Sequence, residues 1–321
     1  MSATATATAT ATLPNYRWIP DWAKVDSGAG HAHHGIVVAR DGSVLTGHAT
    51  DSVVQRLDRD GKLLGSFAVP VGETHCLALG RPGSSETLWI ADVEGHDGGA
   101  PRVIQVDLQG RLLAQITKAD LGYSADEPFV PTAVAVDPAN GEVWIADGYG
   151  SSRVHVLGAD LKRRLTLDGT TGAGRFSCPH WVWVDRRSGT SRIYVADRSN
   201  DRIQVFGSDG SFIKVLKDGL VTPSGFAGFG DFIVVAELKA RVVILDREDR
   251  IVAELGAGRQ HVDKKGWPNR QQADGSVRPP QSDIPTGQFN SPHGIAADPE
   301  GNIYVSEWLL GDRFTKLARA S

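Results

Sequence analysis

The chain has 321 residues, of which 40% are hydrophobic and 22% are charged, and its formal net charge at pH 7 is −4. This is the composition of an ordinary globular protein that is long enough to bury a substantial core. It lacks the basic excess typical of nucleic-acid binding, and no apolar run reaches the ~18 residues that a membrane span needs. We therefore expect neither nucleic acid nor a membrane as a partner.

Residues 1–14 begin with alternating Ala and Thr and lack both the positive and the apolar region of a secretory signal. They predict a disordered tail, and the missing signal predicts a cytoplasmic location. The two cysteines, Cys76 and Cys178, argue against a disulfide-dense secreted scaffold. They leave open a single disulfide, a thiolate ligand or inert buried thiols.

A sequence pattern recurs six times from residue 34 onward. It consists of an apolar strand, a turn with Gly or Asp, a second strand that ends near an acidic residue, and a third strand. The six copies start at His34, His75, Thr132, His180, Ser224 and His293. A period of roughly 40 to 50 residues with several strands per repeat is typical of a β-propeller. We therefore predict an all-β fold, with residues 15–321 forming a single six-bladed propeller.

The last repeat predicts how the propeller closes. Blade 4 has four expected strands, over 181–185, 192–196, 201–206 and 212–216. Blade 6 instead ends after its third strand, at 314–319, whereas residues 16–20 precede blade 1 and have no blade of their own. We expect residues 16–20 to pair with blade 6, because this closes the circle of blades and removes an exposed sheet edge.

Strand direction predicts where the repeat starts gather. Each inner strand runs from one face to the other and the second strand returns, so the six starts and the ends of the second strands share one face, here called the mouth. The connection over 256–289, rich in Gly, Pro, Gln and charge, leaves from this face. A connection this long is usually functional or disordered, and we expect a lid over the mouth.

Four of the six repeat starts are histidines. A single histidine at a strand start usually only caps the strand, but equivalent histidines around one axis converge. His75, His180 and His293 belong to alternate blades, which a threefold rotation relates. Three neutral imidazoles so placed match a catalytic zinc site with positions open for water or substrate.

His34 has alternative predicted roles at this site. It is predicted either to be a fourth metal ligand or to contact the ligands without binding the metal itself. Alternatively, His34 forms a solvated strip with His31 and His33.

Residues 197–206, with the sequence DRSNDRIQVF, resemble the NHL repeat. Within the NHL propellers the chain resembles peptidylglycine α-amidating lyase over blades 2 to 6. In that family one histidine from each of three alternate blades holds zinc in a Pro-His setting. The resemblance implies that His75, His180 and His293 are the ligands of Zn²⁺ or another divalent transition metal.

The resemblance also implies a catalytic tyrosine, because residues 147–153, DGYGSSR, match the family's setting for it and assign the role to Tyr149. Two departures matter. Ala49 lies where the family has an arginine that orients a substrate carboxylate, so Arg198 is predicted to substitute. Gly294 lies where the family has a calcium-binding Asp, which argues against structural Ca²⁺.

These residues predict a metal-dependent, lyase-like enzyme related to the α-hydroxyglycine lyases. It would act at the mouth on a small-molecule or peptide-derived substrate, with hydrolysis as a related possibility. Without the arginine clamp we expect related chemistry on another small substrate rather than α-hydroxyglycine cleavage itself. The sequence indicates no oligomeric state.

Two other classes of function are alternatives to this one. A non-catalytic NHL propeller that binds proteins explains the fold but not the histidines. A calcium-dependent lactonase or phosphotriesterase needs oxygen ligands at the axis, where this chain has His, Thr and Ser. Glu94, Glu237 and Glu307 also reach the mouth, either as an acid or base or, as we expect of most of them, as structural parts of the repeat.

Overall fold

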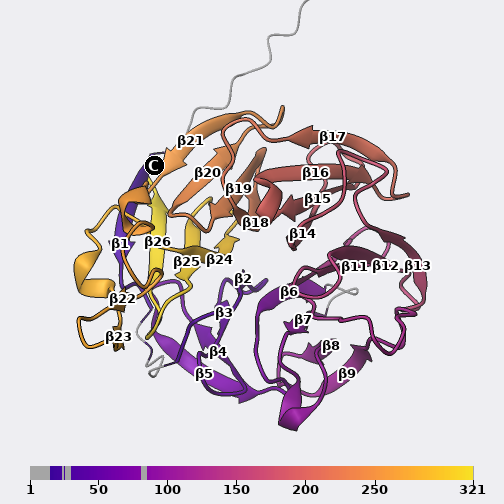
Figure 1. Cartoon of the computed structure of the whole chain (residues 1–321), viewed down its shortest axis with the longest axis horizontal. Helices are drawn as coiled ribbons and strands as arrows, with labels where there is room; N and C mark the ends of the chain where they lie inside the picture. Colours follow the sequence, from indigo (N-terminus) through magenta and orange to yellow (C-terminus); the bar gives the residue numbers. More distant parts are fainter. Residues whose placement is uncertain (1–14, 24, 26–29, 81–84, 321) are drawn as a thin grey trace, which may run out of the picture.

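The computed structural model describes residues 15–23, 25, 30–80 and 85–320, so the tail predicted over 1–14 lies outside the described residues. Six four-stranded antiparallel sheets are arranged radially around a central axis (Figure 1). This confirms the predicted all-β, six-bladed propeller. Within the described residues, no helix is long and apolar enough to cross a membrane.

In every blade the strands lie side by side, from an inner strand at the axis to an outer strand at the rim. Blades 1 to 3 comprise β2 (Ile36–Val38), β3 (Val44–Gly47), β4 (Val53–Leu57) and β5 (Leu63–Ala68); β6 (Cys76–Gly80), β7 (Thr87–Asp92), β8 (Arg102–Asp107) and β9 (Leu112–Ile116); and β10 (Ala133–Val136), β11 (Val143–Asp147), β12 (Arg153–Leu157) and β13 (Arg163–Leu167). Blades 4 to 6 comprise β14 (Pro179–Asp185), β15 (Arg192–Asp197), β16 (Arg202–Gly207) and β17 (Phe212–Leu216); β18 (Pro223–Phe229), β19 (Phe232–Glu237), β20 (Arg241–Leu245) and β21 (Ile251–Leu255); and β24 (Pro292–Ala297), β25 (Ile303–Glu307), β26 (Phe314–Arg319) and β1 (Tyr16–Pro20).

The N-terminal strand closes the propeller. β1 pairs antiparallel with β26, from Tyr16 opposite Arg319 to Pro20 opposite Thr315, and supplies the outer strand of blade 6. The predicted closure is confirmed. It joins the two ends of the chain in one sheet, so blade 6 has no unpaired edge at β26.

The core lies between neighbouring blades. The second strands carry an aromatic residue at the equivalent position in four blades, and all four side chains are buried: Trp89, Trp144, Tyr194 and Tyr304. Large aromatic side chains contribute much of the area buried in a core. This recurring position explains why Trp and Tyr fall inside predicted strands, and it stacks the blades into a rigid frame for the mouth.

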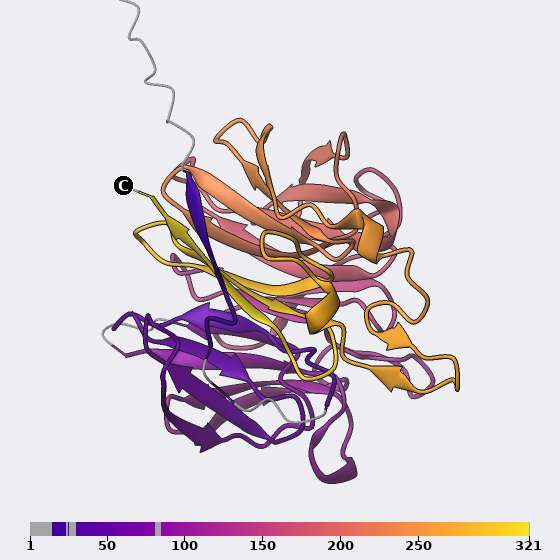
Figure 2. The same cartoon turned by 90° about the vertical axis from the view of Figure 1, so that its left-hand side faces the viewer.

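The long connection between blades 5 and 6 forms some secondary structure of its own. It contains a short hairpin of β22 (Arg270–Gln271) and β23 (Val277–Arg278). The hairpin lies beside blade 6 toward the rim, away from the axis, and projects beyond one side of the propeller (Figures 1 and 2). The lid expected over 256–289 remains a prediction, because this hairpin does not itself cover the axis.

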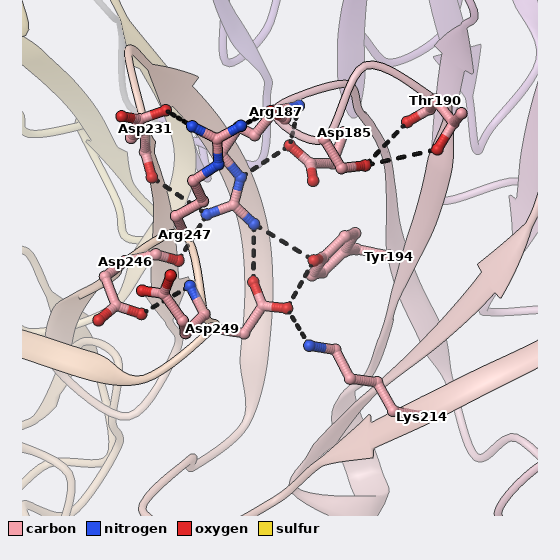
Figure 3. A network of polar contacts seen from close by, with 11 residues as sticks. Asp185, Arg187, Thr190, Tyr194, Lys214, Asp231, Asp246, Arg247 and Asp249 are labelled. Carbon is pink, nitrogen blue, oxygen red and sulfur yellow. Dashed lines mark hydrogen bonds and ion pairs between the residues drawn. The ribbon is translucent and has the colours of Figure 1, made fainter. Parts of the chain in front are cut away.

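A network of charged groups joins blades 4 and 5 at the face opposite the mouth (Figure 3). The Arg187 side chain is 7% exposed and donates to Asp185 at 2.8 Å and to Asp249 at 2.7 Å. The other carboxylate oxygen of Asp249 accepts from the Tyr194 hydroxyl at 2.7 Å and lies 2.5 Å from Lys214 Nζ. Each carboxylate of this network therefore faces a cation or a hydroxyl donor.

Candidate metal centre at the mouth

Three buried histidines meet on the axis at the mouth. His75, His180 and His293 are at most 1% exposed, and their ring centroids are 4.8–5.0 Å apart. They come from the starts of the inner strands of blades 2, 4 and 6, as the repeat predicts. The near-equal spacing follows from the threefold relation between alternate blades.

Local backbone irregularities direct two of these side chains. In blade 4, Pro179 pairs with Asp197 and Trp181 with Ala196, which leaves His180 as an extra residue without a partner on the neighbouring strand. His293 is the extra residue at the matching register shift in blade 6. Such bulges re-aim a side chain and are common beside active sites.

Neighbouring blades fix the protons of two imidazoles. His75 Nδ1 lies 2.6 Å from the carbonyl oxygen of Thr132, and His180 Nδ1 lies 2.7 Å from that of Ser224. A carbonyl oxygen only accepts, so each Nδ1 carries the proton and each Nε2 presents a lone pair. An imidazole bonded in this way through its outer nitrogen is typical of a metal ligand. Neither ring nitrogen of His293 has a hydrogen-bond partner among the described residues.

The fourth histidine of the cluster is His33, which corrects the assignment of His34. A ring nitrogen of His33 lies within 4.8 Å of ring nitrogens of all three buried histidines. His34 Nε2 instead lies 2.8 Å from Asp312 Oδ2, without the alignment of a hydrogen bond, and His34 Nδ1 lies 3.1 Å from the Thr46 hydroxyl. Successive side chains of an extended segment point to opposite sides, so only one of the two neighbours can face the axis.

The two predicted catalytic residues lie at this cluster. The Tyr149 ring is 36% exposed, but its hydroxyl points inward, 3.1 Å from Nε2 of both His33 and His180 and 3.4 Å from that of His75. Arg198 donates to the same hydroxyl at 3.4 Å, and its guanidinium carbon lies 5.4 Å from the centre of the ring.

Burial governs the protonation of this cluster. It lowers the pKa of His75, His180 and His293 well below the ordinary value, with smaller effects in the same direction from His33 and Arg198. Burial raises the pKa of Tyr149 to about 12, although Arg198 opposes this shift. At neutral pH the three buried rings are therefore neutral and the tyrosine is a phenol.

Glu73 is a member of the site that sequence reasoning missed. Its Oε1 lies 2.7 Å from His33 Nδ1, again without hydrogen-bond alignment. Asp92 Oδ1 accepts from the backbone N–H groups of Gly72 and Glu73, which fixes the segment that carries the carboxylate. Its position in the sequence could have indicated a role at the site, because Glu73 precedes His75 by two residues.

The acids at the ends of the second strands are structural. Like Asp92, Asp147 and Asp197 accept backbone N–H groups from the segment that precedes the inner strand of their own blade. Glu237 pairs with Arg241, and Glu307 with Arg313, all four being buried. The alternative acid or base role of Glu237 and Glu307 thus has no free carboxylate to support it, and Glu94 is exposed outside the cluster.

The cysteines do not join the cluster. Cys76 and Cys178 are free thiols, which excludes the disulfide left open by the sequence. Burial raises the pKa of Cys76 to about 12, so this thiol stays protonated. Among the described residues, the group suited to a metal contains histidines alone.

Comparisons with known proteins identify relatives that share this repeat. The NHL repeat model matches residues 130–157. NHL repeat-containing protein 3 of Mus musculus is 29% identical over 212 residues, covering 62% of this chain and 59% of the relative. Peptidyl-glycine alpha-amidating monooxygenase A of Xenopus laevis is 29% identical over 196 residues, covering 58% of this chain but 19% of the relative. The chain thus spans only part of the relatives that it matches.

Solved structures agree on the fold. A streptogramin B lyase structure matches with a TM-score of 0.59 and 16% identity, over 95% of this chain and 98% of that one. An inactive virginiamycin B lyase from Staphylococcus aureus with quinupristin matches with a TM-score of 0.59 and 15% identity, over 95% and 100%. At this identity the likeness shows the propeller fold alone. The chain is therefore a six-bladed β-propeller that carries an NHL repeat and is similar in sequence to the peptidylglycine alpha-amidating monooxygenases.

Proposed function

We propose that this protein is a metal-dependent, lyase-like enzyme whose metal ligands are His75, His180 and His293. The observation that carries the proposal is an excess of lone pairs over protons at one point. Nε2 of His75 and of His180 both lie within 3.4 Å of the Tyr149 hydroxyl, which has one proton to donate, and neither ring nitrogen of His293 has a partner among the described residues. Buried acceptors left without a partner are costly, and a cation satisfies all of them at once.

The donor set fits Zn²⁺ or a similar divalent transition metal. Imidazole nitrogen is a preferred ligand of zinc, whereas calcium takes oxygen ligands. Three histidines leave positions open for substrate, as in catalytic zinc sites. Bound there, such a metal would act as a Lewis acid that polarises a substrate oxygen.

Tyr149 and Arg198 complete the proposed chemistry. The Tyr149 hydroxyl holds a proton beside the open side of the cluster, where it can exchange that proton with a substrate. Arg198 is directed at the same hydroxyl and favours its ionised form, and its guanidinium can bind a carboxylate or an oxyanion. These roles match a lyase in which Tyr149 gives its proton to the leaving group of a small hydroxylated substrate and regains one from the substrate hydroxyl.

The substrate proposal rests on partial similarity. The match to the amidating monooxygenases covers 58% of this chain, and Ala49 has no guanidinium with which to bind a substrate carboxylate. We propose a small peptide-derived or other α-hydroxy compound, bound by Arg198 in place of the missing clamp.

The metal content of the purified protein tests the proposal. We expect about one divalent transition metal per chain, as a three-histidine zinc site requires. His180→Ala should lose that metal, whereas His96→Ala should keep it, because His96 lies outside the cluster at the same face. Tyr149→Phe should keep the metal but lose turnover of 2-hydroxyglycine amides or related α-hydroxy compounds.

A wild-type protein that contains no metal and does not take up Zn²⁺ in calorimetric titration would overturn the enzyme proposal. That result would favour the non-catalytic protein-binding propeller instead.

A further inference from the structure

We propose that His33, positioned by Glu73, is a fourth protein ligand of the metal and is the ligand that an incoming substrate displaces. This inference rests on the proposed metal site but adds a residue to it from outside the blades. His33 lies three residues before the first inner strand, β2, whereas His75 directly precedes β6, and His180 and His293 are the second residues of β14 and β24. Its role is therefore separate from the repeat that places the other three.

The position of the His33 ring supports direct ligation. Its centroid lies 4.4 Å from that of His75 and 4.6 Å from that of His293, closer than the three buried rings lie to one another. Its Nε2 points at the same hydroxyl of Tyr149 as the Nε2 atoms of His75 and His180. The four imidazoles thus surround one point, where each can offer a nitrogen to the same ion.

Glu73 gives His33 the surroundings of a metal ligand. Glu73 Oε1 lies 2.7 Å from His33 Nδ1, and the negative charge of the carboxylate favours a proton on that nitrogen over one on Nε2. In this neutral tautomer, Nε2 offers its lone pair to a metal. Carboxylate–histidine–metal arrangements of this kind orient the ring and make the nitrogen more basic. The negative charge of Glu73 also offsets the charge of a divalent ion bound by neutral imidazoles.

Exposure distinguishes His33 from the other three rings. Its side chain is 19% exposed and that of Glu73 is 23% exposed, whereas the three buried histidines are at most 1% exposed. His33 thus lies between the buried rings and the solvent, on a segment outside the blade strands. The indole of Trp308 flanks it at 5.8 Å, and Trp308 in turn packs on Trp267 of the long connection.

This arrangement defines what can replace His33. The competing group must offer one donor atom to the metal and must fit beside Tyr149 and Arg198. A small anionic oxygen donor, such as a carboxylate or an ionised hydroxyl, meets both requirements, because Arg198 supplies the positive charge. The inference therefore narrows the substrate class to small molecules that coordinate through an anionic oxygen.

Cobalt-substituted protein tests the inference without an activity assay. We compare wild type, His33→Ala and Glu73→Gln, with His31→Ala as the matched control from the same segment. His33→Ala should still bind Co²⁺ through the three buried histidines, but with lower affinity than wild type. Glu73→Gln removes a carboxylate that supports a ligand, which usually costs about 10- to 100-fold in affinity, and it should lose no more than His33→Ala. His31→Ala should match wild type.

Added azide and imidazole then test whether the His33→Ala variant has an open coordination position on the metal. Azide should change the visible Co²⁺ spectrum at lower concentration in His33→Ala than in wild type, because in wild type it must displace His33. Added imidazole should move the His33→Ala spectrum back toward that of wild type. Equal urea midpoints for the metal-free proteins exclude a folding defect as the cause.

Two results would overturn the inference, and they are distinguishable. Wild type and His33→Ala with the same Co²⁺ affinity, spectrum and azide response would exclude His33 as a ligand but leave the three-histidine site intact. A wild type that binds no Co²⁺ or Zn²⁺ would remove the proposed function as well.

Discussion

The two ends of the propeller bury polar groups in opposite ways. At the face away from the mouth, Arg187 lies between Asp185 and Asp249, and each carboxylate has a donor. At the mouth, His293 is equally buried but has no partner for either ring nitrogen among the described residues. Buried polar groups are normally paired, so the first arrangement is explained by stability alone. The second is the arrangement that the proposed metal would complete.

The two ends of the propeller also differ in their electrostatics. The network of Figure 3 combines cations and carboxylates, so each buried charge lies beside an opposite one. Within the part of the chain that the structure describes, no carboxylate lies at ion-pair distance from the three buried histidines, and burial keeps them neutral. Removing members of each group should therefore have opposite consequences for stability and for metal binding.

The largest expected effect is on the far face. Arg187→Ala should lower the free energy of unfolding by about 3–5 kcal/mol, because it leaves Asp185 and Asp249 buried without their shared cation. Metal content should not change. Arg175→Ala is the matched control, since Arg175 is 79% exposed and 3.5 Å from Asp168, and surface pairs contribute about 0–1 kcal/mol. Similar losses in the two variants by urea denaturation would contradict a structural role for the network.

The next largest expected effect is a pH dependence of the stability of the metal-free protein. The folded state keeps His75, His180 and His293 neutral because burial lowers each pKa, whereas the unfolded chain protonates them near pH 6.5. Below that pH the unfolded state binds more protons, so stability present above pH 6.5 is lost on acidification. The slope should be about 1.4 kcal/mol per pH unit for each such histidine.

His155, whose pKa burial lowers to about 3, adds to this slope in the same direction. Urea denaturation of chelator-treated protein at pH 7.5, 6.5 and 5.5 measures the slope. A stability that does not change between pH 6.5 and 5.5 would mean that the cluster takes up protons while folded.

The smallest effect has the opposite sign to the first. His293→Leu should raise the free energy of unfolding of the metal-free protein by about 1 kcal/mol, because it removes two buried, unpaired ring nitrogens. It should also abolish metal binding and reduce the pH slope. His155→Leu is the control: Tyr123 and Thr166 pair both nitrogens of His155, so this variant should be destabilised. Equal destabilisation of the two variants would show that His293 is satisfied in the metal-free protein.

The repeat made much of this molecule predictable. The recurring strands predicted six blades, and the missing outer strand of blade 6 predicted the pairing of residues 16–20 with β26. Equivalent positions in alternate blades also predicted that His75, His180 and His293 meet on the axis. These inferences succeeded because each depends on symmetry, which the sequence displays directly.

Residues outside the repeat were less predictable. Sequence reasoning assigned the first-blade position to His34, but its neighbour His33 faces the axis, because a shift of one residue in an extended segment reverses the side. Glu73 was missed, since its partner His33 belongs to that same non-repeating segment.

The sequence by itself determined the fold, its closure and the three histidines of the repeat, because these follow from local strand patterns and rotation about an axis. Only the tertiary structure decided which histidine joins them and which carboxylate supports it. It also showed that the acids ending the second strands are occupied by backbone N–H groups or arginines. Those outcomes depend on how residues 30–35 pass across the mouth and on which lone pairs remain free there, and neither is encoded by the period of the repeat.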